Sequence, residues 1–289
     1  MNIWRMVAPT IKIDQGNLTR IEEASMSLQK SIAVFGGNGF LGRKICEVGV
    51  ELGYKVGAFS RSGVAPSSAK GKWVEQVSWN SANIFDSKTY EEQLKEYDTV
   101  VHSIGILFEN QSYKKSMNSN FDFLQDIQRL ANTVKGSNPM DKNDYNTYGA
   151  IQRDSAVLLA DSFLKVHDKG NYVYISADQA IPIVPEEYIT TKREAEFELS
   201  CKPNLRTIVM RPGFMYDDSE SHTNRDFLKS LLNLGYSTKE LVIGDKIEFF
   251  NRLIRPPVST EKVAWTIYEK LQDETFKGVV GLDEIVKNL

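Results

Sequence analysis

The stretch that decides the fold is Ile32–Gly42, which reads Ile-Ala-Val-Phe-Gly-Gly-Asn-Gly-Phe-Leu-Gly. An apolar run leads into a glycine-rich turn and then an amphipathic helical window, the order found where a dinucleotide pyrophosphate meets a helix N-terminus. Gly36 permits the tight turn, Gly39 lets a pyrophosphate approach the backbone, and Gly42 lets the helix pack closely on the strand. Counted from Gly37, the same residues also satisfy GxGxxG, so both registers stay open. The expected cofactor contacts are Gly36, Gly37, Asn38, Gly39, Phe40, Leu41 and Gly42.

The end of the second predicted strand indicates which nicotinamide cofactor is bound. In NAD-binding proteins an acid at this position holds the ribose 2′-hydroxyl. Here the chain reads Phe59-Ser60-Arg61-Ser62 without an acid, and Arg61 lies 19 residues after Gly42, where a guanidinium can grip a 2′-phosphate. The sequence therefore favours NADP(H), with contacts from Ser60, Arg61 and Ser62. Arg43 is either a second cation for the phosphate or a solvated residue of the first helical turn.

From Ser31 onward, short β-rich runs alternate with longer amphipathic windows, as in a parallel sheet covered by helices on both faces. The predicted fold class is α/β: a Rossmann-type doubly wound parallel sheet with a small C-terminal substrate lobe. The predicted strands are 32–35, 55–59, 74–80, 99–103, 172–176, 207–210 and 279–282, and the predicted helices are 43–52, 89–96, 151–166, 191–199 and 260–271.

Three units are expected along the chain. Residues 1–30 form an N-terminal extension, residues 31–210 the NADP(H)-binding Rossmann domain, and residues 211–289 the substrate lobe packed on it. The first twenty residues combine apolar and basic residues with one acid, which is compatible with a targeting presequence. A disordered, dispensable tail and translation starting at Met26 are equally good interpretations.

Bulk composition excludes several classes of protein. The chain has 289 residues, 41% of them hydrophobic, and a formal net charge of -3, which gives no reason to expect a nucleic-acid partner. Cys46 and Cys201 lie far apart in sequence and indicate a reducing compartment rather than a disulfide framework. The three histidines lack metal-ligand spacing, so no metal is expected, and His102 is interpreted as a packed core residue. Without a run of roughly 18 apolar residues we expect no transmembrane helix, which leaves peripheral contact with a membrane.

A candidate catalytic set follows the fifth predicted strand. Tyr188 and Lys192 lie four residues apart at the start of a helical window and therefore on one helix face. Ser176 ends the preceding strand, 12 residues before Tyr188. A neighbouring cation favours the phenolate and lowers the phenol pKa from its reference of about 10, which makes Tyr188 a usable proton donor or acceptor. Ser176 and Tyr188 are expected to hydrogen-bond a substrate carbonyl or alcohol oxygen, and Lys192 the nicotinamide ribose.

The glycine turn, the Ser-Tyr-Lys set and the segment Arg211–Tyr216 (RPGFMY) together resemble the extended short-chain dehydrogenase/reductase superfamily over residues 31–289. In that superfamily the RPG segment lines the nicotinamide side of the site, and Arg255–Ser259 resembles the segment that closes the substrate lobe. An adenine-contacting aspartate is common at the position of Asn83. The remaining cofactor contacts that this resemblance implies are Asn83, Ile84, Ser103, Pro212 and Gly213.

Within the superfamily, the motifs VFGGNGFLG, SRSG, YISAD, YITTKREAE and RPGFMY look most like an atypical branch. That branch contains the NADPH-binding accessory subunit of respiratory complex I and a fungal mitochondrial accessory protein of ubiquinone biosynthesis, to which the match is closer. The resemblance implies a peripheral protein on the matrix side of the mitochondrial inner membrane, with other ubiquinone-biosynthesis proteins as partners. Phe35 and Gln152 depart from the usual threonine and asparagine of the superfamily.

The sequence is compatible with three functions. The first is an NADP(H)-dependent oxidoreductase acting on a carbonyl or alcohol of an apolar, quinone-like substrate. The second is a non-catalytic, NADPH-holding accessory subunit of the ubiquinone-biosynthetic complex, which the atypical residues Gln152 and Asn83 and the family resemblance favour. The third is a nucleotide-sugar epimerase or dehydratase, whose substrate diphosphate could be bound by the basic residues Lys229, Lys239, Arg252 and Arg255.

Overall fold

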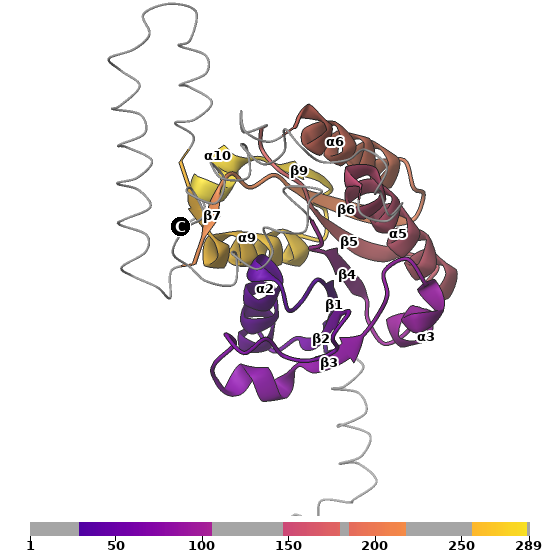
Figure 1. Ribbon diagram of the computed structural model, residues 1–289, viewed down its shortest axis with the longest axis vertical. Coiled ribbons are helices and arrows are strands. Elements are labelled where there is room, and N and C mark those ends of the chain that lie inside the picture. The colour runs from indigo at the N-terminus through magenta and orange to yellow at the C-terminus, as the bar shows by residue number, and fades with distance from the viewer. Residues whose placement is uncertain (1–28, 106–146, 180–184, 218–255, 288–289) are drawn as a thin grey trace, which may run out of the picture.

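The computed structural model describes residues 29–105, 147–179, 185–217 and 256–287 (Figure 1). Its main sheet has seven strands in the order β3-β2-β1-β4-β5-β6-β9, and every neighbouring pair is parallel. The order changes direction beside β1, which is the switch point of a doubly wound sheet, so the predicted fold class is confirmed. The strands are β1 Ser31–Phe35, β2 Lys55–Ser60, β3 Ser78–Ser81, β4 Thr99–His102, β5 Gly170–Ile175, β6 Leu205–Met210 and β9 Gly278–Val280.

Helices cover both faces of the sheet, as Figure 1 shows. Alternation along β1 feeds two separate cores: Ile32 and Val34 pack under α2 and α9, while Ala33 and Phe35 pack under α3, α5 and α6. The helices are α2 Phe40–Glu51, α3 Glu91–Leu94, α5 Ser155–Val166, α6 Glu186–Ser200, α9 Thr260–Gln272 and α10 Leu282–Lys287. Shorter elements are η1 Lys72–Gln76, η2 Ser87–Thr89, the π-helical turn η6 Gly149–Asp154, and the paired strands β7 Met215–Tyr216 and β8 Val258–Ser259.

Aromatic residues fix the two cores. On the α2–α9 face, the Tyr268 hydroxyl donates to the Ile45 carbonyl at 2.8 Å, which joins the two helices. On the opposite face, Phe35 stacks on Phe59 with ring centroids 4.7 Å apart. Stacked aromatic pairs add to the free energy gained by burial. The phenylalanine that replaces the superfamily's usual threonine is therefore a core residue of this chain.

One predicted strand is only partly a strand. The expected run 74–80 is divided into η1 and β3. Trp73 is buried and its Nε1 donates to the Lys70 carbonyl at 2.9 Å, while Trp79 Nε1 donates to the Val74 carbonyl at 3.0 Å. These local hydrogen bonds pair both indole N–H groups with nearby backbone carbonyls and stabilise a compact turn. Such side-chain to backbone bonds cannot be predicted from the spacing of apolar residues.

The C-terminal residues return to the Rossmann domain. Strand β9 is the last strand of the main sheet, paired with β6, and α9 packs against α2. The prediction of a lobe over 211–289 therefore does not hold for 260–287. Residues 218–255, which include most of the rest of that segment, lie outside the described residues, as do 1–28. Among the described helices, none is long and apolar enough to cross a membrane.

We predict that Gly42→Ala destabilises the chain by about 2 kcal/mol or more, because a Cβ at this position would lie 2.1 Å from the Gly36 carbonyl oxygen. Urea denaturation measures the change. The matched control is Gly281→Ala, since a Cβ at Gly281 meets no atom within 4 Å. Equal stability of the two variants would contradict the packing assigned to Gly42.

Candidate functional site

The sequence-predicted site residues meet at one edge of the molecule. All seven strands are parallel, so their carboxyl ends share an edge of the sheet. The glycine turn follows β1, Ser60 ends β2 and Arg61 and Ser62 follow it, Asn83 and Ile84 follow β3, Ser103 follows β4, Ser176 follows β5, and Pro212 and Gly213 follow β6. Tyr188 and Lys192 reach this edge from the first turns of α6. The four basic residues considered for a nucleotide-sugar diphosphate lie outside the described residues.

The glycine turn has the geometry that a pyrophosphate requires. Gly36 has φ +85°, in the left-handed region, and its N–H donates to the Phe59 carbonyl at 2.8 Å. A Cβ at Gly37 would lie 2.7 Å from the Ala58 Cβ, so this glycine is also needed for packing. The N-terminus of α2 has no side-chain cap at Gly39 and no acid in its first turn. Its free N–H groups and positive dipole end are therefore available to an anion.

The ribose side of the site is built from hydroxyls and one exposed cation. Asn38 Nδ2 donates to Ser62 Oγ at 3.2 Å, which ties the glycine turn to the end of β2, and Ser60 Oγ lies 3.3 Å from Ser62 Oγ. Arg61 is exposed, and its guanidinium makes no hydrogen bond or ion pair within the described part of the chain. The position is thus cationic, and it carries no acid that would repel a phosphate.

The other candidate cation is already engaged. Arg43 forms an ion pair with Asp217 at 2.8 Å and donates to Ser68 Oγ at 2.7 Å. Neither interpretation from the sequence, a free second cation or a merely solvated residue, describes this side chain. No sequence motif predicted this pairing, because Asp217 lies 174 residues from Arg43.

Lys192 is buried among aromatic rings. Its side chain is only 3% exposed, and Nζ donates to the Ile175 carbonyl at 2.9 Å. The same nitrogen lies 5.4 Å from the ring centroid of Tyr174 and 5.5 Å from that of Tyr188. Burial lowers the pKa of Lys192 to about 7, with the charge of Glu196 opposing and that of Arg193 adding to the shift. The predicted Tyr188–Lys192 pair is therefore brought together.

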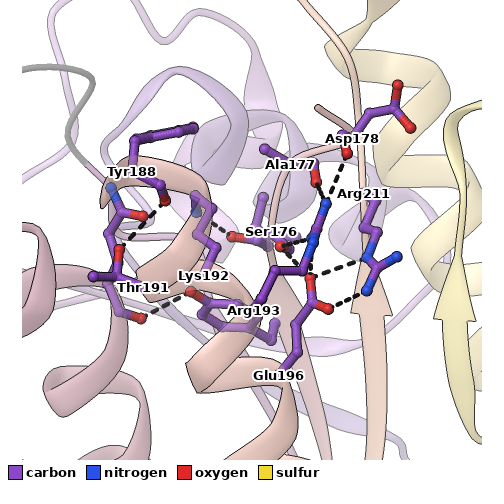
Figure 2. Close-up of polar contacts among 12 residues, drawn as sticks. Ser176, Ala177, Asp178, Tyr188, Thr191, Lys192, Arg193, Glu196 and Arg211 are labelled. Carbon is purple, nitrogen blue, oxygen red and sulfur yellow. Dashed lines mark hydrogen bonds and ion pairs between the residues drawn. The ribbon is translucent and has the colours of Figure 1, made fainter. Parts of the chain in front are cut away.

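Ser176 points to a different set of partners (Figure 2). Its hydroxyl donates to Glu196 Oε1 and accepts from Arg193 Nη1 at 3.1 Å. Arg211 donates to both carboxylate oxygens of Glu196, and Nη2 of Arg193 donates to the carbonyls of residues 177 and 178 at 2.8 and 2.7 Å. We call Ser176, Arg193, Glu196 and Arg211 the carboxylate cluster.

The carboxylate cluster is a buried charge that is paired on both sides. Burial acts to raise the pKa of Glu196, but hydrogen bonds from Arg211 and Ser176 and the charges of both arginines hold it below its ordinary value. The cluster joins the segment after β5 to the segment after β6, where the Asp178 N–H also donates to the Pro212 carbonyl at 2.9 Å. Sequence reasoning missed Glu196, although it continues the four-residue spacing of Tyr188 and Lys192.

Three further residues have local roles. Asn83 Oδ1 accepts from the Phe85 N–H at 3.2 Å, and Asp86 caps η2 by accepting from the Lys88 N–H. His102 is fully buried with Nε2 2.8 Å from Ser155 Oγ, and burial, with the charge of Lys192, lowers its pKa to about 3. His102 is thus the packed, neutral histidine expected. No group of His, Cys, Asp and Glu residues in the described ranges could hold a metal ion.

The comparisons with known proteins agree with this geometry. Residues 85–245 match the family described as "Male sterility protein", an NAD-binding family, and residues 32–137 match the NAD dependent epimerase/dehydratase family. The chain belongs to the NAD(P)-binding Rossmann superfamily of epimerase-like and short-chain-dehydrogenase-like proteins. The superfamily predicted from the sequence motifs is therefore confirmed.

Among individual proteins, the chain is 40% identical over 273 residues to MIOREX complex component 2 of Saccharomyces cerevisiae, covering 89% of this chain and 98% of that protein. It is 26% identical over 259 residues to an uncharacterised chloroplastic protein of Arabidopsis thaliana, covering 88% and 75%. Neither name refers to ubiquinone biosynthesis, so these relatives do not support the predicted closer match to a ubiquinone-biosynthesis protein.

Two solved structures share the fold. One is the Bordetella bronchiseptica enzyme WbmH in complex with NAD+, with a TM-score of 0.51 at 14% identity, covering 88% of this chain and 75% of that one. The other is a short chain dehydrogenase from Burkholderia cenocepacia J2315 in complex with NADP, with a TM-score of 0.51 at 12% identity, covering 90% and 92%. One binds NAD and the other NADP, so the fold does not discriminate between the cofactors.

We predict that Lys192→Met changes how stability depends on pH. The pKa of Lys192 falls from 10.5 to about 7 on folding, so between these values the unfolded chain binds the extra proton and raising the pH favours the folded state. The variant lacks this dependence. Relative to wild type it is most stable at pH 7 and below, and its advantage shrinks toward pH 10.5 by up to about 1.4 kcal/mol per pH unit.

Urea denaturation at pH 7, 8 and 9 measures the effect. Lys55→Met, which removes an exposed lysine from the same sheet, serves as the control and keeps the wild-type slope because Lys192 is still present. If Lys192→Met has the wild-type slope as well, Lys192 is not the buried, desolvated amine described.

Proposed function

We propose that this chain is an NADP(H)-dependent oxidoreductase acting on a carbonyl or alcohol group of an apolar substrate, with Tyr188 as the proton-transferring residue. The observation that carries the proposal is the position of Lys192 Nζ, 5.5 Å from the Tyr188 ring centroid, at the sheet edge that also carries the glycine turn. A bound nicotinamide supplies or accepts the hydride. The chain's own task is to hold the substrate oxygen and exchange its proton.

Tyr188 and Lys192 divide that task. The Tyr188 hydroxyl gives a proton to the carbonyl oxygen in reduction and takes it back in oxidation. Lys192 stabilises the phenolate when it is charged. Because burial lowers the pKa of Lys192 to about 7, an anionic ligand in the crevice favours the charged form and prepares the tyrosine for chemistry. Ser176, whose hydroxyl is held by Glu196, belongs to the positioning of this edge rather than to proton transfer.

The cofactor proposal rests on Arg61 and on the loop around it. NADP(H) carries a 2′-phosphate that a free guanidinium binds through charge-assisted hydrogen bonds. Arg61 is exposed at the end of β2, beside Ser60 and Ser62 and opposite the glycine turn. The residues proposed to contact the nucleotide, which we call the nucleotide cradle, are Gly36, Gly37, Asn38, Gly39, Phe40, Leu41, Gly42, Ser60, Arg61, Ser62, Asn83, Ile84, Ser103, Pro212 and Gly213.

We further propose a mitochondrial location and a quinone-related substrate, within ubiquinone biosynthesis on the matrix side of the inner membrane. Support comes from the motif resemblance and, for membership of a larger assembly, from the 40% identical relative that is named a component of the MIOREX complex. That name also favours a second candidate, a cofactor-holding subunit that stabilises its partners without turnover. The hydrogen bond that occupies Ser176 agrees with this alternative.

We predict that Tyr188→Phe abolishes function and leaves the fold intact. Loss of general acid–base catalysis lowers turnover by about 10²- to 10⁴-fold. Cells lacking the protein are supplied with the wild-type chain or the variant at matched levels, and ubiquinone and its precursors are quantified by mass spectrometry. The expected result is a lowered ubiquinone level with one accumulated precursor, which identifies the substrate.

Tyr54→Phe is the matched control, because it removes a buried hydroxyl on the α2–α9 side of the sheet, in the core that contains Tyr268. It is expected to restore ubiquinone fully. If Tyr188→Phe restores ubiquinone as well as wild type does, the phenol performs no chemistry and the chain acts as a non-catalytic subunit. An unchanged quinone profile in cells lacking the protein would reject the pathway.

We predict that Arg61→Gln weakens NADPH binding by about ten- to a hundredfold and NADH binding by less than threefold, since charged hydrogen bonds to the 2′-phosphate are lost. Fluorescence titration of the purified chain with each nucleotide measures both dissociation constants. An equal loss for the two nucleotides would reject Arg61 as the phosphate ligand.

A further inference from the structure

Arg43 directly follows the glycine turn that is proposed to bind the nucleotide. It belongs to the first turn of α2, directly after Gly42, and its guanidinium lies 5.5 Å from the ring centroid of Phe40. Its Nη1 donates to Ser68 Oγ at 2.7 Å, and Ser68 is in the connection that leaves β2 at Arg61. Arg43 thus follows the glycine turn in sequence and contacts the connection between β2 and η1 through Ser68.

The Arg43 guanidinium is paired with a carboxylate. Arg43 Nη2 pairs with Asp217 Oδ2 at 2.8 Å, and the two side chains are 23% and 13% exposed. Partial burial reduces solvent screening, so the pair is stronger than an average surface ion pair. Both terminal nitrogens of Arg43 are therefore engaged, one by Ser68 and one by Asp217.

A 2′-phosphate and the Asp217 carboxylate are rivals for one cation. The phosphate carries close to two negative charges at neutral pH, so it is attracted to Arg43 and repelled by Asp217. NADH, which has a 2′-hydroxyl instead, does not compete. Arg61 differs from Arg43 because no described group has to release it first.

We propose that Asp217 sets the preference between NADPH and NADH by holding Arg43. Asp217 is a positioning residue that acts through the arginine. The inference rests on the proposed NADP(H) function and adds to it a residue outside the nucleotide cradle, one that directly follows β7. Because Asp217 follows β7, binding of the 2′-phosphate is coupled to the position of Asp217 at the end of the RPGFMY segment.

The test measures NADPH and NADH dissociation constants of the full chain for wild type, Asp217→Asn, Arg43→Gln and the double variant. Removing the competing carboxylate tightens NADPH binding by about three- to tenfold, and NADH binding changes by less than twofold. In the Arg43→Gln background, Asp217→Asn has no effect on the NADPH-to-NADH ratio, since no cation remains to be released. A thermal unfolding curve confirms that each variant is folded.

Glu96→Gln is the matched control. Glu96 pairs with Lys55 at 2.6 Å, and Lys55 begins β2 at the opposite end from Arg61. The Glu96→Gln variant is expected to leave the ratio of the NADPH and NADH dissociation constants unchanged. An unchanged or lowered preference for NADPH in folded Asp217→Asn, or an equal effect with and without Arg43, overturns the inference. Failure of wild type to bind NADPH would instead overturn the proposed function, so the two failures are distinguishable.

Discussion

The structure depends on a close backbone contact between Gly36 and Gly42, in the turn that joins β1 to α2. A Cβ on residue 42 would lie only 2.1 Å from the Gly36 carbonyl oxygen. Glycine at both positions therefore lets α2 begin directly after β1. The Gly36 N–H is satisfied by the Phe59 carbonyl of β2, so the turn is held by the sheet itself. This contact aims an uncapped helix N-terminus at the crevice and places the end of β2 beside it. The anion site and the position of Arg61 both follow from it.

A second constraint organises the other half of the crevice. The carboxylate cluster joins the segments after β5 and β6 through one buried carboxylate and two arginines. A buried charge is tolerated only with such pairing, and removing one partner leaves the other uncompensated. Lys192, four residues earlier on α6, is instead buried with the Ile175 carbonyl and two aromatic rings as neighbours. Its positive charge is therefore destabilising at this buried position, which is typical of groups that serve function rather than stability.

Much of this architecture could be predicted from the sequence, because glycine spacing and strand alternation are local signals. All seven strands of the main sheet were expected near their observed positions, and the Tyr188–Lys192 pair follows from helical spacing. What could not be predicted depends on contacts distant in sequence. The pairing of Arg43 with Asp217 joins residues 174 apart, and β9 completes the sheet from within the segment expected to form a lobe. Ser176 was expected to face the substrate, and its capture by Glu196 required knowing how α6 packs on β5 and β6.

Transfer of hydride from NADPH to a substrate distinguishes an oxidoreductase from a cofactor-holding subunit. Purified chain is incubated with a small-molecule extract, including the quinone fraction, and NADPH carrying deuterium at the transferable position of C4, and products are surveyed by mass spectrometry. We expect one apolar product that gains a single deuterium with wild type and does not form with Tyr188→Phe. If NADPH binds but no deuterium reaches any product, the chain holds its cofactor without turnover, and the claim of catalysis is wrong.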